Sequence, residues 1–134
     1  MTRRPQYCGR IILGLFICLA GIYLSYRVLT PELPLVGVIQ WTREVKTFDD
    51  SLQGVIEGLR EDGYQNGLNI CLEVVQVHGE RDEAAAAAQE FLQKKASLII
   101  TLGTVPTLIA LEVTRGSGIP LVYTNVGAPD ATLV

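Results

Sequence analysis

Apolar and polar positions divide the chain into segments typical of alternating strands and helices. Four short runs are largely apolar and suit strands covered on both faces: 35–41, 70–77, 97–102 and 119–125. The longer segments between these runs are predicted to be helices: 47–63, 81–96 and 104–115. This alternation predicts an α/β fold, a doubly wound parallel sheet with right-handed crossovers and the strand order 2-1-3-4.

Helical spacing of apolar residues indicates which faces of the first two helices pack on the sheet. In the first helix the apolar positions are Leu52, Val55, Ile56 and Leu59. In the second, which contains five consecutive alanines, the apolar stripe is Ala84, Ala87, Ala88, Phe91 and Leu92. Small side chains allow a helix to approach a sheet closely, so we expect both stripes to face the core.

Two threonines are predicted as helix N-caps. Thr47 precedes the first apolar stripe, and Gly63 is the expected stop of that helix. Thr104 precedes Pro106, which is tolerated in the first turn because its missing N–H needs no partner there. We therefore expect free backbone N–H groups near Thr104 that could bind an anion or a carbonyl oxygen.

The first segment of the chain differs in kind from the rest. Arg3, Arg4 and Arg10 precede an apolar run from Ile11 to Tyr26. Residues 1–29 are therefore predicted to be a signal peptide or membrane anchor, with cleavage and retention about equally favoured. The basic flank keeps the N-terminus in the cytoplasm, so residues 30–134 should form a lobe in the periplasm or on the extracytoplasmic face of the membrane.

Charge in the second segment argues against one class of partner. After residue 29 the chain carries seven basic and fourteen acidic residues, a net charge of −7. Nucleic acids need a basic surface, so the sequence excludes them as partners.

Polar side chains follow three of the predicted strands. In doubly wound sheets ligands bind at the carboxyl ends of the strands, near the point where the strand order reverses. That rule brings together a set of hydroxyl, amide, glycine and aromatic residues: Gln40, Trp41, Thr42, Gly103, Thr104, Tyr123, Thr124 and Asn125. None of them is charged, so this edge should orient a small molecule and not perform acid–base chemistry.

Signatures of catalysis are missing from the sequence. His78 is the only histidine, and it follows the second strand, away from the reversal point. No cysteine or histidine pair has the spacing of metal ligands, and the glycine-rich dinucleotide and phosphate loops are absent. We therefore predict no enzymatic activity, no catalytic residue, no metal and no cofactor.

Three phrases together resemble a known family. They are the turn "GLREDGYQNGLN" at 58–69, the strand-to-helix turn "TLGTVPT" at 101–107 and the strand "IPLVY" at 119–123. The chain from Leu35 onward resembles the ABC-transporter substrate-binding proteins that include the tryptophan and tyrosine types, which have the type I periplasmic-binding fold.

The resemblance implies a solute-binding component of an ABC uptake transporter. Such a protein would close two lobes over an amino acid or similar small solute and deliver it to a permease in the membrane. Only the first lobe would be present here, and the Thr104 amides would receive the carboxylate of the solute. The alternative is a membrane-anchored extracytoplasmic sensory domain of a signalling protein.

Overall fold

The structure is a computed structural model that describes residues 18–21, 23, 32–42 and 45–127. The chain divides into two units, Met1–Glu32 and Leu33–Val134. In the first unit residues 18–21 and 23 are helical, while most of the predicted leader lies outside the described residues. The described part of the chain contains no helix both long and apolar enough to cross a membrane. The leader therefore stays a prediction.

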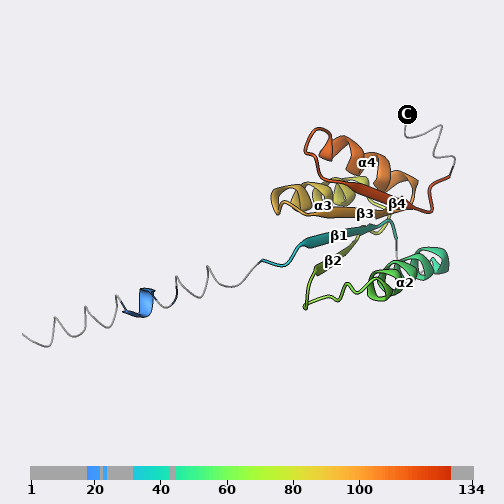
Figure 1. The fold of residues 1–134 in the computed structure, drawn as a ribbon. Helices are drawn as coiled ribbons and strands as arrows, with labels where there is room; N and C mark the ends of the chain where they lie inside the picture. Colours follow the sequence, from blue (N-terminus) through green and yellow to red (C-terminus); the bar gives the residue numbers. More distant parts are fainter. Residues whose placement is uncertain (1–17, 22, 24–31, 43–44, 128–134) are drawn as a thin grey trace, which may run out of the picture. The chain divides into compact units, whose positions relative to one another are not determined.

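The second unit contains a four-stranded sheet in the predicted order (Figure 1). Its strands are β1 (Leu35–Gln40), β2 (Cys71–Gln76), β3 (Leu98–Leu102) and β4 (Leu121–Thr124). All three strand pairs are parallel, and the sheet runs β2-β1-β3-β4. The predicted α/β fold and strand order are confirmed.

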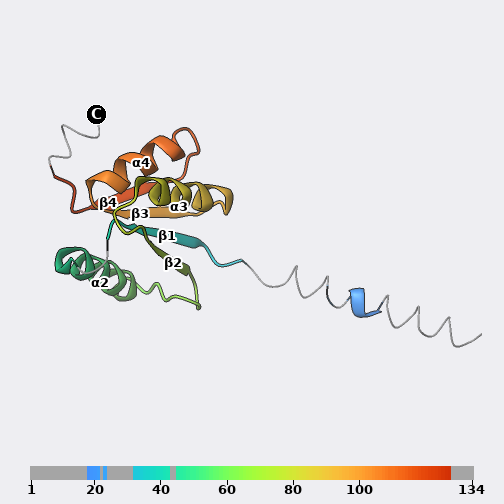
Figure 2. The same cartoon turned by 180° about the vertical axis from the view of Figure 1, so that it is seen from behind.

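Helices cover both faces of this sheet. They are α2 (Lys46–Glu61), α3 (Arg81–Gln93) and α4 (Thr104–Thr114). Figures 1 and 2 show α3 and α4 together on one face and α2 on the other. Crossovers that place helices on both faces explain why the strands are apolar on both sides.

The face under α3 and α4 carries a close-packed apolar core. Ala84, Ala87, Ala88 and Phe91 of α3 are buried, as the alanine-rich stripe predicts. The ring of Phe91 packs directly on Gly37 of β1. A Cβ atom at this position would lie only 2.6 Å from the ring. The glycine therefore makes room for the aromatic ring.

The face under α2 is packed less deeply. No residue of α2 is fully buried. Its apolar stripe is only half-buried against a second cluster that includes Val36, Val38, Ile100 and Leu102. The predicted stripe faces the sheet, but Ile56 is 36% exposed.

Both predicted N-caps are wrong. Helix α2 begins at Lys46 with Val45 as its N-cap, so Thr47 lies inside the first turn. Helix α4 begins at Thr104 with Gly103 as its N-cap, at φ 117°. Glycine adopts this conformation without the steric cost that a side chain would bring, so the helix starts one residue early. Pro106 lies in the first turn, as predicted.

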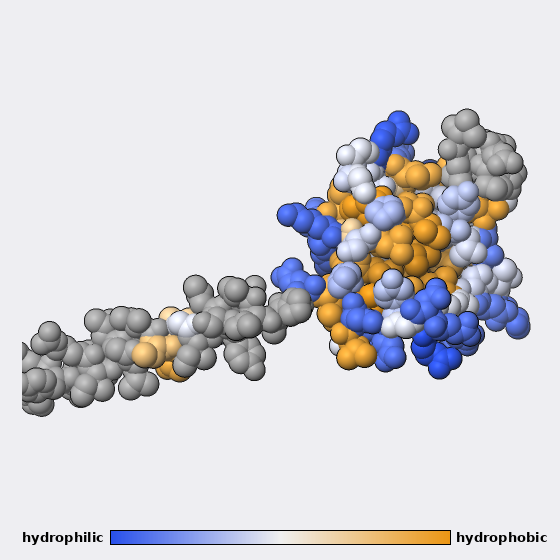
Figure 3. Space-filling model, in the orientation of Figure 1, coloured by the Kyte–Doolittle hydropathy of each residue, from blue (hydrophilic) through white to orange (hydrophobic). Residues whose placement is uncertain are grey.

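Strand β4 lies at one border of the sheet among the described strands. Its side chains are exposed on both faces, Val122 at 52% and Tyr123 at 42%. Figure 3 shows apolar surface gathered in the middle of this view of the compact unit, with hydrophilic residues around it.

Candidate functional site at the carboxyl edge of the sheet

One row of paired residues crosses the carboxyl edge of the sheet. Gln40 pairs with Gln76 on one side and Leu102 on the other, and Leu102 pairs with Thr124. Backbone hydrogen bonds continue the row beyond the strands, from Trp41 N to Leu102 O (3.3 Å) and from Gly103 N to Thr124 O (2.9 Å). The loops predicted to line a site thus start from a common edge.

Gln40 is fully buried, and its side-chain amide is bonded within the protein. Its Nε2 donates to Asp49 Oδ1 at 2.7 Å and to Thr42 O at 3.0 Å. Its Oε1 accepts from Gln76 Nε2 at 3.1 Å. A buried amide bonded in this way fixes its partners. Gln40 thus holds the Asp49 carboxylate and the Thr42 loop in place.

Trp41 and Gly103 lie against each other beneath the first turn of α2. A Cβ atom added to Gly103 would lie 3.1 Å from the ring of Phe48 and 3.4 Å from Cβ of Trp41. Trp41 itself is half-buried and packs against the core under α3 and α4. The first turn of α2 therefore closes over the ends of β1 and β3.

The start of α4 presents backbone donors. Pro106 has no N–H, and Thr107 N donates to Gly103 O at 3.3 Å. The N–H groups of Thr104 and Val105 have no acceptor among residues 32–42 and 45–127. Thr104 Oγ1 accepts from Gly127 N at 3.1 Å, which leaves its hydroxyl hydrogen as a further donor. This end of the site is suited to an acceptor group.

A buried pair of threonines orders the turn between β3 and α4. Thr107 Oγ1 donates to Gly103 O at 2.6 Å, and Thr101 Oγ1 lies 2.8 Å from Thr107 Oγ1. Since a hydroxyl has one hydrogen, Thr101 must donate to Thr107. The chain of two hydroxyls holds the carbonyl of Gly103 in place.

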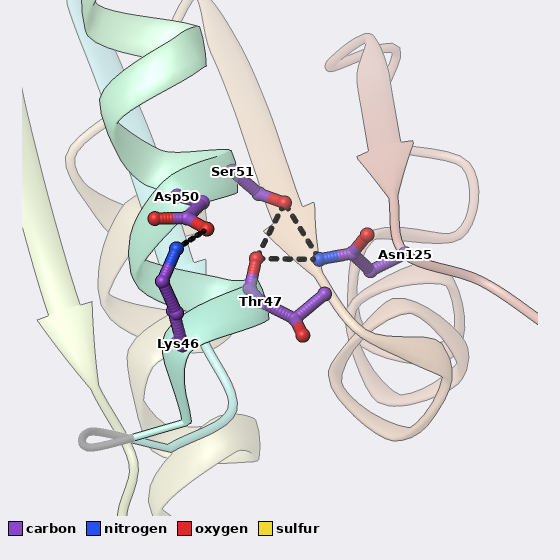
Figure 4. A network of polar contacts seen from close by, with 5 residues as sticks. All are labelled: Lys46, Thr47, Asp50, Ser51 and Asn125. Atoms are coloured by element: carbon purple, nitrogen blue, oxygen red, sulfur yellow. Dashed lines mark hydrogen bonds and ion pairs between the residues drawn. The ribbon is translucent and has the colours of Figure 1, made fainter.

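The predicted site residues at the end of β4 do not all lie on the same face of the sheet. Tyr123 pairs with Thr101 and lies on the face that carries α4. Thr124 pairs with Leu102 at the carboxyl edge. Asn125 follows the strand at φ 57°, and its side chain reaches α2, where Nδ2 donates to Ser51 Oγ at 2.7 Å and to Thr47 O at 3.3 Å (Figure 4).

Sequence reasoning missed the residues that α2 adds to this edge. Thr47, Phe48, Asp49 and Ser51 contact Asn125, Gly103 or Gln40, although they were assigned only to the helix. The available signal was topological. A helix that directly follows a parallel strand starts at the carboxyl edge of the sheet, so its first turn belongs to the same region.

Charge does reach this edge through α2. The Asp49 carboxylate accepts from Gln40. One residue further on, Asp50 Oδ2 pairs with Lys46 Nζ at 2.7 Å (Figure 4). The hydrogen bond to Asp50, followed by its charge, raises the pKa of Lys46 above its ordinary value. The edge is therefore less neutral than the sequence indicates.

A surface cavity of about 520 Å³ lies elsewhere, under the C-terminal half of α2. Ile56, Leu59, Tyr64 and Ile70 contribute to its lining. The described residues contain no group of three His, Cys, Asp or Glu side chains that could hold a metal ion.

Comparison with protein families gives one match along almost the whole second unit. A family model described as "ABC transporter substrate binding protein" matches residues 36–133. None of the curated proteins matches the chain.

Several solved structures share the fold. One is the ligand-free, open structure of CD0873, a substrate-binding protein with adhesive properties from Clostridium difficile. It is 24% identical in sequence, with a TM-score of 0.70, and the match covers 75% of this chain and 33% of CD0873. A conserved domain protein from Vibrio cholerae is also 24% identical in sequence, with a TM-score of 0.70. The match covers 76% of this chain and 33% of that protein.

A third is an ABC domain from Streptococcus pneumonia in complex with L-Trp. It is 17% identical in sequence, with a TM-score of 0.68, and the match covers 76% of this chain and 33% of that domain. The chain thus spans about a third of the length of these neighbours, and its sheet corresponds to one lobe of such a protein.

Proposed function

Because the chain belongs to the family of ABC transporter substrate-binding proteins, we propose that it is the extracytoplasmic solute-binding component of an ABC uptake transporter. The family match over residues 36–133 carries this proposal. Its solute is an amino acid or a similar small molecule, and its partner is a permease in the membrane. The proposal assigns the chain no reaction.

The carboxyl edge supports this choice of solute. The N–H groups of Thr104 and Val105, which have no acceptor among the described residues, and the Thr104 hydroxyl suit a carboxylate. The neighbour from Streptococcus pneumonia is a complex with L-Trp. L-Tryptophan is therefore the first probe to test.

Isothermal titration of the full chain with L-tryptophan tests the proposal. We expect Thr104→Val to weaken binding roughly tenfold, the effect of about one lost hydrogen bond to a charged group. Thr114→Val is the matched control, because it makes the same change in α4 at the far end, where Thr114 Oγ1 donates to Ala110 O. Equal affinity of both variants and the wild type would contradict the assigned site.

Fractionation of cells expressing the full chain tests its place in the cell. A cleaved or released product supports solute uptake. A product that keeps residues 1–29 and stays in the membrane as an uncleaved anchor supports the sensory alternative.

A further inference from the structure

The surface cavity under α2 lies at the amino end of the sheet, apart from the carboxyl edge. Its volume is about 520 Å³, and its lining comes from the C-terminal half of α2, the turn after this helix and the start of β2. Leu72 of the lining lies four residues before Gln76, which is at the carboxyl edge. At about 3.3 Å per residue in a strand, these two positions are roughly 13 Å apart. A molecule in the cavity would therefore not occupy the carboxyl edge.

Apolar side chains form most of the walls of this cavity. Ile70 is only 4% exposed, and Leu59 and Leu72 are half-buried against the core cluster under α2. Ile56 and Tyr64 leave more of their surface uncovered, at 36% and 51% exposure. Pockets for small molecules commonly have volumes of about 300–1,000 Å³ and mostly apolar walls with a few polar groups. Volume and walls thus suit a small apolar molecule.

The turn between α2 and β2 is held in shape by its own amide side chains. Asn69 Nδ2 donates to Gly63 O at 2.9 Å, and Asn69 Oδ1 accepts from Gln65 N at 2.7 Å. Asn66 Oδ1 accepts from Leu72 N at 2.9 Å. A backbone N–H can only donate, so the oxygen of the Asn66 amide must face Leu72 and its NH₂ group must be directed elsewhere. This wall of the cavity is therefore pre-formed and carries a donor of known polarity.

Arg60 supplies the single charge among the lining residues, and that charge is positive. Its guanidinium has no ion-pair partner within the described part of the chain. Glu61 and Asp62 follow Arg60 in the chain, but neither pairs with it and neither lines the cavity. A guanidinium binds a carboxylate through two parallel hydrogen bonds, which an ammonium or a neutral group cannot match. The charge of the lining therefore favours a carboxylate.

We propose that this cavity is a second binding site, which takes a small molecule with an apolar body and one carboxylate group. The apolar body lies against Leu59, Ile70 and Leu72. The carboxylate accepts hydrogen bonds from Arg60 and from Nδ2 of Asn66. The inference is independent of the proposed function, because none of these residues belongs to the carboxyl edge.

Octanoate and 1-octanol are the matched probes, because they share one alkyl chain length and only octanoate has a carboxylate. A ¹H–¹⁵N NMR titration of the full chain measures both the affinity and the place of binding. We expect octanoate to shift the backbone amides of residues 59–72 and to bind roughly tenfold more tightly than 1-octanol. The absence of shifts in 59–72, or equal affinity for the two probes, would overturn the inference.

Arg60→Gln tests the role of the positive charge. This variant should bind octanoate roughly tenfold more weakly than the wild type and 1-octanol equally well. Arg115→Gln is the matched control, because Arg115 is also exposed at the C-terminal end of a helix, α4, and does not line the cavity. It should keep the wild-type affinity for both probes. Unchanged binding of octanoate to Arg60→Gln would overturn the inference.

Two substitutions of Ile56 test whether the carboxylate lies in the cavity. Ile56 is 36% exposed, so both variants should fold, which circular dichroism checks. Ile56→Glu adds a negative charge to the lining and should weaken octanoate binding more than tenfold. Ile56→Gln has a side chain of similar size without the charge, so it should weaken octanoate and 1-octanol to a similar, smaller extent. Equal affinity of the two variants for octanoate would place the carboxylate outside the cavity and overturn the inference.

Discussion

The two faces of the sheet are held by different kinds of contact. Under α3 and α4 the contacts are mainly apolar, with Phe91 and Ala88 at 0% exposure, and the buried hydroxyls of Thr101 and Thr107 bond to each other. Under α2 no helical residue is fully buried, and specific hydrogen bonds reach the first turn of the helix from Gln40 and Asn125.

The difference separates stability from geometry. Apolar burial is non-directional and roughly proportional to area, so the face under α3 and α4 supplies most of the folding free energy. Hydrogen bonds contribute less but fix the positions of particular atoms. The face under α2 therefore arranges the carboxyl edge, while the opposite face keeps the sheet folded.

Removing a large side chain from each face should have unequal effects. Phe91→Ala should lower the free energy of unfolding by about 3–5 kcal/mol, as expected for a buried aromatic residue. Leu52→Ala on α2 should cost only about 1–2 kcal/mol, because Leu52 is half-buried. Urea unfolding of the full chain followed by circular dichroism measures both. Equal losses would remove the distinction between the faces.

A double variant sharpens the same test. Gly37→Ala should destabilise the wild type, because its Cβ atom would lie 2.6 Å from the Phe91 ring. In the Phe91→Ala background that clash is absent, so the second substitution should cost far less than in the wild type. Additive losses would contradict the packing described.

The contact between α2 and the turn after β3 predicts an intermediate effect. Gly103→Ala should cost about 1–3 kcal/mol, because φ is 117° and the new Cβ atom would lie 3.1 Å from the Phe48 ring. Gly118→Ala is the control, since its φ is 78° but nothing lies within 4 Å. Thermal unfolding should show a larger loss for Gly103→Ala; equal losses would mean that Phe48 does not restrict this turn.

The smallest effect concerns charges that join α3 to β2. Lys94 Nζ lies 2.8 Å from Glu73 Oε1 and 2.7 Å from Glu90 Oε1. Hydrogen bonds to Glu73 and then Glu90 raise the pKa of Lys94 from 10.5 to about 12. A raised pKa means that the contribution to stability is complete below pH 10.5 and is lost as the pH rises through 12.

Comparison with Lys94→Met across this pH range isolates that contribution. The difference in melting temperature between the wild type and the variant should be small, because the pair is exposed to solvent, and it should shrink between pH 10 and 12. A difference that stays constant would show that Lys94 acts through its aliphatic stem alone.

Elements and their order could be predicted from the sequence because alternation of apolar runs and helical stripes depends on short stretches of chain. The two helix starts were misplaced for a local reason, since hydroxyl-bearing threonines suggested caps that Val45 and Gly103 occupy instead. Gly103 is the N-cap of α4 because the positive φ at this position suits a residue without a side chain.

The candidate site could be predicted only in outline. The rule for doubly wound sheets placed the loops after β1, β3 and β4 at one edge, and their strands do end there. It could not indicate that Gln40 is saturated by Asp49 and Gln76, or that the Asn125 amide is turned toward α2. Such contacts join distant residues, and periodicity carries no information about them.

The hydrogen bonds from the Asn125 side chain to Thr47 and Ser51 also have a consequence for the order in which contacts form as the chain folds. Ser51 and Asn125 are 74 residues apart, so closing this contact is entropically costly until the intervening strands have paired. The hydrogen bonds that hold the beginning of α2 to Asn125 therefore form only after β4 has paired with β3.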